Sequence, residues 1–380
     1  MQDFVHLHVH TQYSLLDGQA SIPKLVDKAI ADGMRGMAVT DHGNMFGIKE
    51  YFDYCCKVNG KRKKEGLEPF KPIFGCEMYV ARRGDKGLRE IKQDQSGWHL
   101  IVLAKNETGY KNLVKLVSRS WVDGYYMRPR TDHKDLAQYH EGLIIASACL
   151  GGEIPKKIMS GDIAAAEEAI EWFKGIWGED YYLEVQRHQV RDPRQRANRE
   201  VFGLQQKVNE VILELAKKHD VKVIATNDVH FVDEDNAEAH DHLLCLSTNK
   251  DLNDPTRMLY SKQEWMKTKA EMWEMFSDVP EALANTVEIC DKVDTEILCD
   301  ADVNADHNTN DAAPADKAEK PRLIESIFEF VELLLLTLAA VFIVTTFIFR
   351  HSVVDGDSMM NTLQHEDVLI ISGLFYTPEQ

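Results

Sequence analysis

Residues 6–11 read HLHVHT, which places His6, His8 and His10 at alternate positions of a strand expected over Phe4–Val9. Side chains at alternate positions of a strand point to the same face. The three imidazoles can therefore converge on one point, and imidazole is a common zinc ligand. The stretch predicts a metal site, and its alternative is a stack of hydrogen-bonded histidines.

Short apolar runs alternate with amphipathic helical patterns as far as about residue 298. Further strands are expected at Gly36–Thr40, Pro72–Cys76, Leu100–Ala104, Leu143–Ala146, Tyr182–Val185 and Val221–Ala225. Helices are expected between them, including Ile22–Ala31, Tyr110–Val117, Ala164–Phe173 and Glu200–Lys218. This alternation predicts an α/β domain built on a parallel sheet or a barrel.

Polar side chains that can bind metals follow several of the expected strands. They are His42 after GMAVTD, Glu77 after KPIFGC, Cys149 after GLIIASA, and Asp228 and His230 after KVIATN. In α/β barrels the carboxyl ends of the strands carry the active site, because the βα loops emerge there. Two further candidates are Asp17, in the loop after the first strand, and His99, at the start of WHLIVLA.

The formal net charge of −18 makes the chain acidic, and an acidic chain as a whole is not an obvious nucleic-acid binder. Phosphate contacts need Lys and Arg, so a role on DNA must rest on local basic groups or on bound cations. Arg128 and Arg130 in YYMRPR are the favoured candidates for DNA contacts, with the Tyr125-Tyr126 pair available for base stacking. The alternative is an ordinary solvated surface.

Six ordered motifs resemble those of the PHP domain at the start of bacterial DNA polymerase III alpha subunits. They are HLHVHTQYSLLDG, AVTDHGNMFG, PIFGCEMYV, WHLIVLAKNETGYKNL, SACLGGEIP and ATNDVHF, and the resemblance covers nearly all of residues 1–298. It implies a distorted seven-stranded (β/α)7 barrel. It also implies that the domain is metal-dependent.

The resemblance implies nine metal ligands, all of a type that binds metal: His8, His10, Asp17, His42, Glu77, His99, Cys149, Asp228 and His230. His6 lies outside the family's histidine pair. Up to three divalent ions are expected; a Cys149 thiolate favours zinc, with manganese or magnesium as alternatives. Such ions lower the pKa of a bound water so that it can attack a phosphodiester.

In active members of the family the reaction is 3′–5′ exonucleolytic proofreading at a DNA primer 3′ end. The resemblance thus implies DNA and the other replicase subunits as partners. The alternative is a non-catalytic PHP module that braces a polymerase. The polymerase palm is absent from these 380 residues, so no DNA synthesis is expected.

The composition changes near residue 299. Residues 299–321 are acidic, rich in Asn, Asp and Ala, and predict a disordered linker. Leu333–Phe349 is apolar apart from three threonines, so residues 322–350 predict one transmembrane helix, with a buried core helix as the alternative. Basic residues gather on its N-terminal side. They predict a cytoplasmic PHP domain and a single pass through the inner (cell) membrane.

Residues 351–380 resemble the nucleophile region of type I signal peptidases and imply a truncated β fragment of that catalytic domain. Ser358 stands at the nucleophile position. A serine needs a base, which is a lysine in that family, and no lysine follows Lys320. We therefore expect this fragment to be inactive by itself. The two resemblances suggest unrelated segments joined near residue 300, by a natural fusion, an assembly error or deliberate joining.

Overall fold

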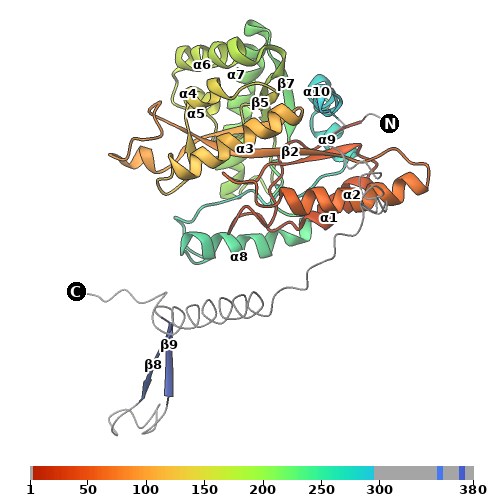
Figure 1. Ribbon diagram of the computed structural model, residues 1–380. Helices are drawn as coiled ribbons and strands as arrows, with labels where there is room; N and C mark the ends of the chain where they lie inside the picture. The colour runs from red at the N-terminus through yellow and green to blue at the C-terminus, as the bar shows by residue number, and fades with distance from the viewer. Residues whose placement is uncertain (1–2, 295–348, 354–367, 373–380) are drawn as a thin grey trace, which may run out of the picture. The chain divides into compact units, whose positions relative to one another are not determined.

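The computed structural model describes residues 3–294, 349–353 and 368–372, in two units that divide after Asn308. The first unit is a mixed α/β half-barrel with strand order β1-β2-β3-β5-β6-β7, and β4 pairs with β2 (Figure 1). Its strands are β1 (Gly36–Val39), β2 (Lys71–Ala81), β3 (Gly97–Ala104), β4 (Arg130–Thr131), β5 (Leu143–Ala146), β6 (Tyr181–Gln186) and β7 (Lys222–Thr226).

Strand β3 runs antiparallel to both of its neighbours, β2 and β5, whereas the other neighbouring strands are parallel. The expected alternatives are a parallel sheet or a barrel, and this strand departs from the parallel pattern of both. The reversal brings the start of β3 to the edge where the neighbouring parallel strands end, and His99 pairs with Tyr79 there. His99 thus joins the rim although it begins its strand.

The segment expected as a first strand, Phe4–Val9, forms no regular strand, although Val9 makes an isolated bridge to Val229. It bonds to β1 on one side, where the Ala38 amide donates to His6 O at 2.8 Å. On the other side the Val229 amide, just after β7, donates to His8 O at 3.1 Å. The segment therefore links the two edges of the half-barrel and carries its histidines between them.

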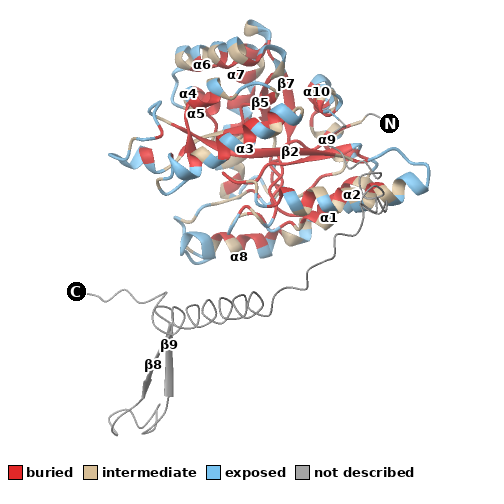
Figure 2. Ribbon diagram, in the orientation of Figure 1, coloured by how far each residue is buried: buried red, intermediate tan, exposed pale blue. Residues whose placement is uncertain are grey.

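Helices flank the sheet, and Figure 2 shows that the strands and the inner faces of the helices hold most of the buried positions. In α1 the apolar residues Ile22, Leu25, Val26 and Ala29 recur at helical spacing and are all buried. The helices are α1 (Ile22–Ala31), α2 (Ile48–Lys64), α3 (Glu107–Val122), α4 (His133–Gln138), α5 (Glu153–Met159), α6 (Ile163–Trp177), α7 (Gly203–His219), α8 (Ala237–Thr248), α9 (Lys269–Met275) and α10 (Pro280–Lys292).

In the second unit, β8 (Phe349–Val353) pairs antiparallel with β9 (Val368–Ser372). The expected linker at 299–321 and Ser358 lie outside the described residues, as does the expected membrane helix over 322–348. The last two residues assigned to that helix begin β8 instead. Within the described ranges, no helix is long and apolar enough to cross a membrane.

Candidate metal centre

Glu77 lies at the middle of the expected ligands. Its Oε1 atom is 3.3 Å from His8 Nε2 and 2.9 Å from His99 Nδ1. Its Oε2 atom is 2.5 Å from His42 Nδ1, and Cys149 Sγ lies 3.7 Å from Oε1. Glu77 projects from the interior of β2, which runs five residues beyond its expected end at Cys76. One carboxylate therefore contacts ligand candidates from four other parts of the chain.

Asp228 collects a second set of contacts just after β7. Its Oδ1 atom is 3.1 Å from His8 Nε2, 3.3 Å from His10 Nε2 and 3.6 Å from His230 Nδ1. The backbone of Asp228 has φ 47°, in the left-handed region that non-glycine residues seldom adopt. Backbone strain of this kind gathers at functional sites.

Asp17 completes the cluster from the loop after the first segment. Its Oδ2 atom lies 3.0 Å from His42 Nε2, and its Oδ1 atom lies 3.8 Å from His230 Nε2. Two residues that the sequence analysis did not single out also face it. His240 Nε2 is 3.9 Å from Asp17 Oδ1, and the Tyr260 hydroxyl is 3.4 Å from Asp17 Oδ2.

The structure thus brings all nine expected ligands into one connected cluster. Within it, three groups have ligand atoms close enough to share an ion: His10, His42 and His230; His8, His10 and Asp228; and His42, Glu77 and His99. Buried carboxylate oxygens lie against histidine nitrogens here: Glu77 Oε2 is 2.5 Å from His42 Nδ1 and Asp228 Oδ1 is 3.1 Å from His8 Nε2, whereas Asp17 Oδ1 has no hydrogen-bond partner. Buried oxygens of this kind need a compensating cation, so the donor set fits divalent metal ions.

Outer hydrogen bonds orient the two histidines of the first segment. His8 Nδ1 donates to Glu184 Oε1 at 2.7 Å. His10 Nδ1 lies 2.9 Å from Ser14 Oγ, whose own proton goes to Asp41 Oδ1 at 2.7 Å. Ser14 therefore accepts from His10, and both Nε2 lone pairs face the cluster. Such outer contacts fix the tautomer of metal-binding histidines.

The electrostatics keep the carboxylates ionised. Burial would raise the pKa of Glu77, but His99 and His42 hold it well below its usual range. His8 and His230 do the same for the pKa of Asp228 against its own burial. Burial and the charge of Glu77 raise the pKa of the Cys149 thiol. Metal binding to this thiol must therefore release a proton.

The two expected DNA contacts differ in their surroundings. Arg128 is exposed, and its guanidinium lies 5.9 Å from the centre of the Tyr79 ring. Arg130 is only 1% exposed, and its guanidinium donates to the carbonyl oxygens of Gly124, Leu88 and Lys86. The expectation of a DNA contact from Arg130 is therefore corrected to a structural role.

His6 points away from the cluster, and its Nε2 atom bonds to Lys267 O at 2.8 Å. The irregular backbone of the first segment explains why alternate histidines do not all converge.

The sequence analysis did not identify Glu184, His240 and Tyr260 as residues of the site. Glu184 lies within the apolar run of a buried strand. His240 and Tyr260 are distant in sequence from Asp17, so no local motif marks any of the three.

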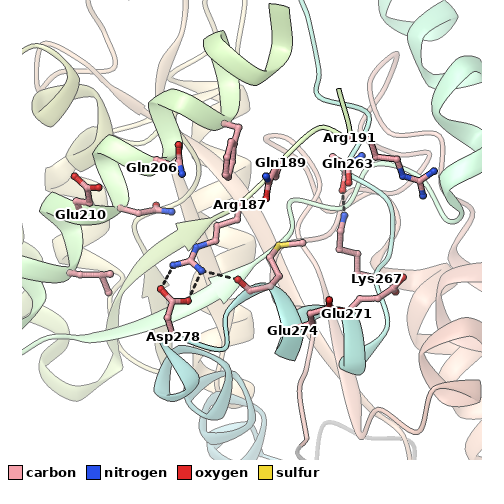
Figure 3. Close-up of a pocket in the computed structure, with 14 residues that line it drawn as sticks. Arg187, Gln189, Arg191, Gln206, Glu210, Gln263, Lys267, Glu271, Glu274 and Asp278 are labelled. Carbon is pink, nitrogen blue, oxygen red and sulfur yellow. Dashed lines mark hydrogen bonds and ion pairs between the residues drawn. The ribbon is translucent and has the colours of Figure 1, made fainter. Parts of the chain in front are cut away.

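Two pockets matter for the location of a site. A small one, about 130 Å³, adjoins the cluster and is lined in part by Asp17 and His42. A larger one, about 970 Å³, is lined by none of the nine expected ligands (Figure 3). Its Arg187 is held by Asp278 through contacts of 2.6 and 2.8 Å. The pocket with more volume therefore lacks candidate metal ligands, whereas the small pocket adjoins them. We place the candidate site at the small pocket, because the ligand types gather there.

Residues 6–188 match the family model described as PHP domain, and residues 327–380 match the model described as signal peptidase, peptidase S26. DNA polymerase III subunit alpha of Borreliella burgdorferi is 43% identical over 295 residues, covering 77% of this chain and 24% of the relative. The Treponema pallidum protein of the same name is 38% identical over 296 residues, covering 77% and 23%. The chain therefore spans about a quarter of the length of these curated relatives.

Among solved structures, histidinol phosphate phosphatase of Lactococcus lactis, in complex with zinc, L-histidinol and phosphate, is 14% identical with a TM-score of 0.28, covering 60% of this chain and 87% of that one. A likeness this remote identifies no function. The closer comparisons agree with the motifs. Residues 6–188 match the PHP domain model, and alignments over 295 and 310 residues are 43% and 33% identical to DNA polymerase III subunit alpha of two relatives.

Proposed function

We propose that the N-terminal unit is a metal-dependent phosphodiesterase of the 3′–5′ exonuclease type, acting on a DNA primer 3′ end. The observation that carries the proposal is the cluster around Glu77, in which the carboxylates of Glu77, Asp228 and Asp17 lie against five imidazoles in groups that could hold metal ions. The similarity to DNA polymerase III subunit alpha supports DNA as the substrate and replicase subunits as partners.

The nine expected ligands would hold up to three divalent ions. Bound cations would supply a water of lowered pKa and neutralise charge on the phosphodiester oxygens. Glu77 can be shared between ions, because its two oxygens face different histidines, His99 and His42. Cys149 would bind as a thiolate, which would favour zinc over manganese or magnesium. The low pKa of Asp228 keeps it a charged ligand at neutral pH.

The test is release of nucleotides from the 3′ end of a 5′-labelled primer by the purified chain. We expect release with zinc or manganese, loss on chelation, and loss in Asp228→Ala. The control is Asp251→Ala, which removes an exposed carboxylate outside the cluster. A chain that binds metal but leaves every DNA end intact would favour the alternative, a non-catalytic module.

We also propose that residues 322–380 are the start of a type I signal peptidase, with a membrane helix within 322–348, ahead of β8, and Ser358 at the nucleophile position. The family match over 327–380 supports this proposal. No lysine follows Lys320, so these residues supply no lysine base. On the positive-inside argument the PHP domain would be cytoplasmic and the helix would cross the inner (cell) membrane once. A preprotein mixed with the chain should remain uncut, and its turnover would refute this expectation.

A further inference from the structure

The exposed aromatic side chains gather at one place. Within residues 3–294, the aromatic residues classed as exposed are Phe46, Trp121 and Tyr125, at 55%, 40% and 46% exposure. All three line the pocket of about 130 Å³ beside Asp17 and His42. Isolated exposed apolar residues are ordinary, but a cluster beside a polar site marks a binding surface.

The three rings form a continuous surface. The Phe46 and Trp121 ring centres are 5.8 Å apart, and the Trp121 and Tyr125 rings are stacked, with centres 5.5 Å apart and planes at 18°. The Trp121 indole nitrogen donates to Gly43 O at 2.8 Å. Because Gly43 follows His42, this bond fixes the aromatic surface to the loop that carries a metal-ligand candidate.

The surface also continues into the metal cluster. The Tyr79 ring lines the same pocket, with its centre 6.1 Å from that of the His42 ring, and Arg128 lines it too. The Arg128 guanidinium is 5.9 Å from the Tyr79 ring centre. A ligand in this pocket would therefore meet aromatic rings, a guanidinium and two side chains of the metal cluster, Asp17 and His42.

We propose that Phe46, Trp121 and Tyr125 form a stacking platform for the terminal base of a single-stranded DNA 3′ end whose phosphate reaches the metal cluster. The inference rests on the proposed function and specifies its substrate as an unpaired end. Exposed rings stack on bases that are not paired, irrespective of sequence. A duplex would need rows of basic side chains. This pocket offers one arginine, in a chain of net charge −18.

The test compares two single-stranded oligothymidylates that bind to the full chain with zinc present. Both carry a phosphorothioate last linkage that resists cleavage, and one has an abasic 3′ nucleotide. We expect the oligonucleotide with the terminal base to bind about tenfold more tightly. Phe46→Ala and Tyr125→Ala should remove most of this difference, and Phe46→Tyr should retain it. Neither Phe46 nor Tyr125 is buried, so these variants should fold.

The matched control is Leu67→Ala, which removes an exposed apolar side chain far from the pocket lining. It should bind both oligonucleotides as the wild type does. Equal affinity of the wild type for the two oligonucleotides would overturn the inference. So would an unchanged difference in Phe46→Ala, the result expected if the surface contacts another protein. Nucleotide release without base-dependent binding would refute the platform alone, whereas base-dependent binding without release would refute the proposed hydrolysis alone.

Discussion

His8 Nδ1 lies 2.7 Å from Glu184 Oε1, and both side chains are buried. The same carboxylate oxygen accepts from Thr226 Oγ1 at 2.5 Å and from Gln186 Nε2 at 2.9 Å. Glu184 is thus held by Gln186 of its own strand, β6, and by Thr226 of the neighbouring strand, β7. It holds the imidazole of His8 with Nε2 toward Asp228, at 3.1 Å. Glu184, which is outside the nine expected ligands, therefore sets the direction of a ligand lone pair.

Replacing this carboxylate should weaken metal binding without unfolding the domain. We expect Glu184→Gln to lower zinc affinity by about 10- to 100-fold, because the ring of His8 loses its orienting acceptor. Competition with a chromophoric chelator measures the affinity. Glu288→Gln is the control, since Glu288 pairs with Lys222 outside the cluster. Equal zinc affinity in wild type and Glu184→Gln would refute the orienting role.

Arg128 and Arg130 offer a matched pair of substitutions. Arg130→Ala should lower the free energy of unfolding by about 3 kcal/mol, because three backbone carbonyls lose a buried donor. Arg128→Ala should change it by less than about 0.5 kcal/mol, because the side chain is exposed. It should instead weaken oligonucleotide binding and reduce the salt dependence by about one phosphate contact. Urea unfolding and salt titrations separate the two, and reversed effects would contradict these assignments.

The local sequence was sufficient to predict the bounds of a helix or strand where those bounds depend on the element's own residues. Ile22–Ala31 and Leu143–Ala146 have the bounds expected from their patterns, since burial on one helix face or along a short apolar run leaves a clear periodicity. The direction of β3 could not be read in this way. Strand direction depends on which neighbours pair, and WHLIVLA has the same composition in either direction.

The sequence allowed prediction of those site residues that come directly after an expected strand. Asp228 and His230 could be found because they come directly after an apolar run. His240 and Tyr260 come from α8 and a later loop, and only the tertiary structure brings them to Asp17. The failure at Arg130 has a similar cause. An arginine in a loop motif can be exposed or buried, and burial is decided by the surrounding carbonyl groups.

Metal removal should destabilise the N-terminal unit. Without cations, the cluster retains the buried carboxylates of Glu77 and Asp228 and an Asp17 oxygen that lacks a hydrogen-bond partner. Zinc at 100 times its dissociation constant should add about 2.7 kcal/mol to the free energy of unfolding. Calorimetry with and without chelator should show a melting temperature several degrees lower in the chelated protein. Glu77→Gln should respond less than the wild type, and identical melting temperatures with and without zinc would contradict the prediction.

His6 should make the metal-free domain sensitive to acid. Burial lowers the pKa of His6 to about 4, whereas the unfolded chain has a histidine pKa of about 6.5. Between these values the unfolded state binds a proton that the native state does not. The free energy of unfolding therefore falls as the pH drops through this window, by roughly 2 kcal/mol from His6 between pH 7 and pH 5.

Urea unfolding in chelator at the two pH values measures this effect. His6→Gln retains a donor for Lys267 O but cannot be protonated, so its stability should fall by roughly 2 kcal/mol less than that of the wild type. The wild type and His6→Gln share all other titrating groups, so the difference isolates His6. The same loss in both proteins would refute the prediction.

The metal content of the purified full chain tests the central claim most directly. After dialysis against zinc and then against metal-free buffer, elemental mass spectrometry should find more than one and up to three ions per chain. Glu77→Gln should hold fewer, because Glu77 contacts ligand candidates in more than one group. A folded wild-type chain that retains no divalent ion would contradict the account.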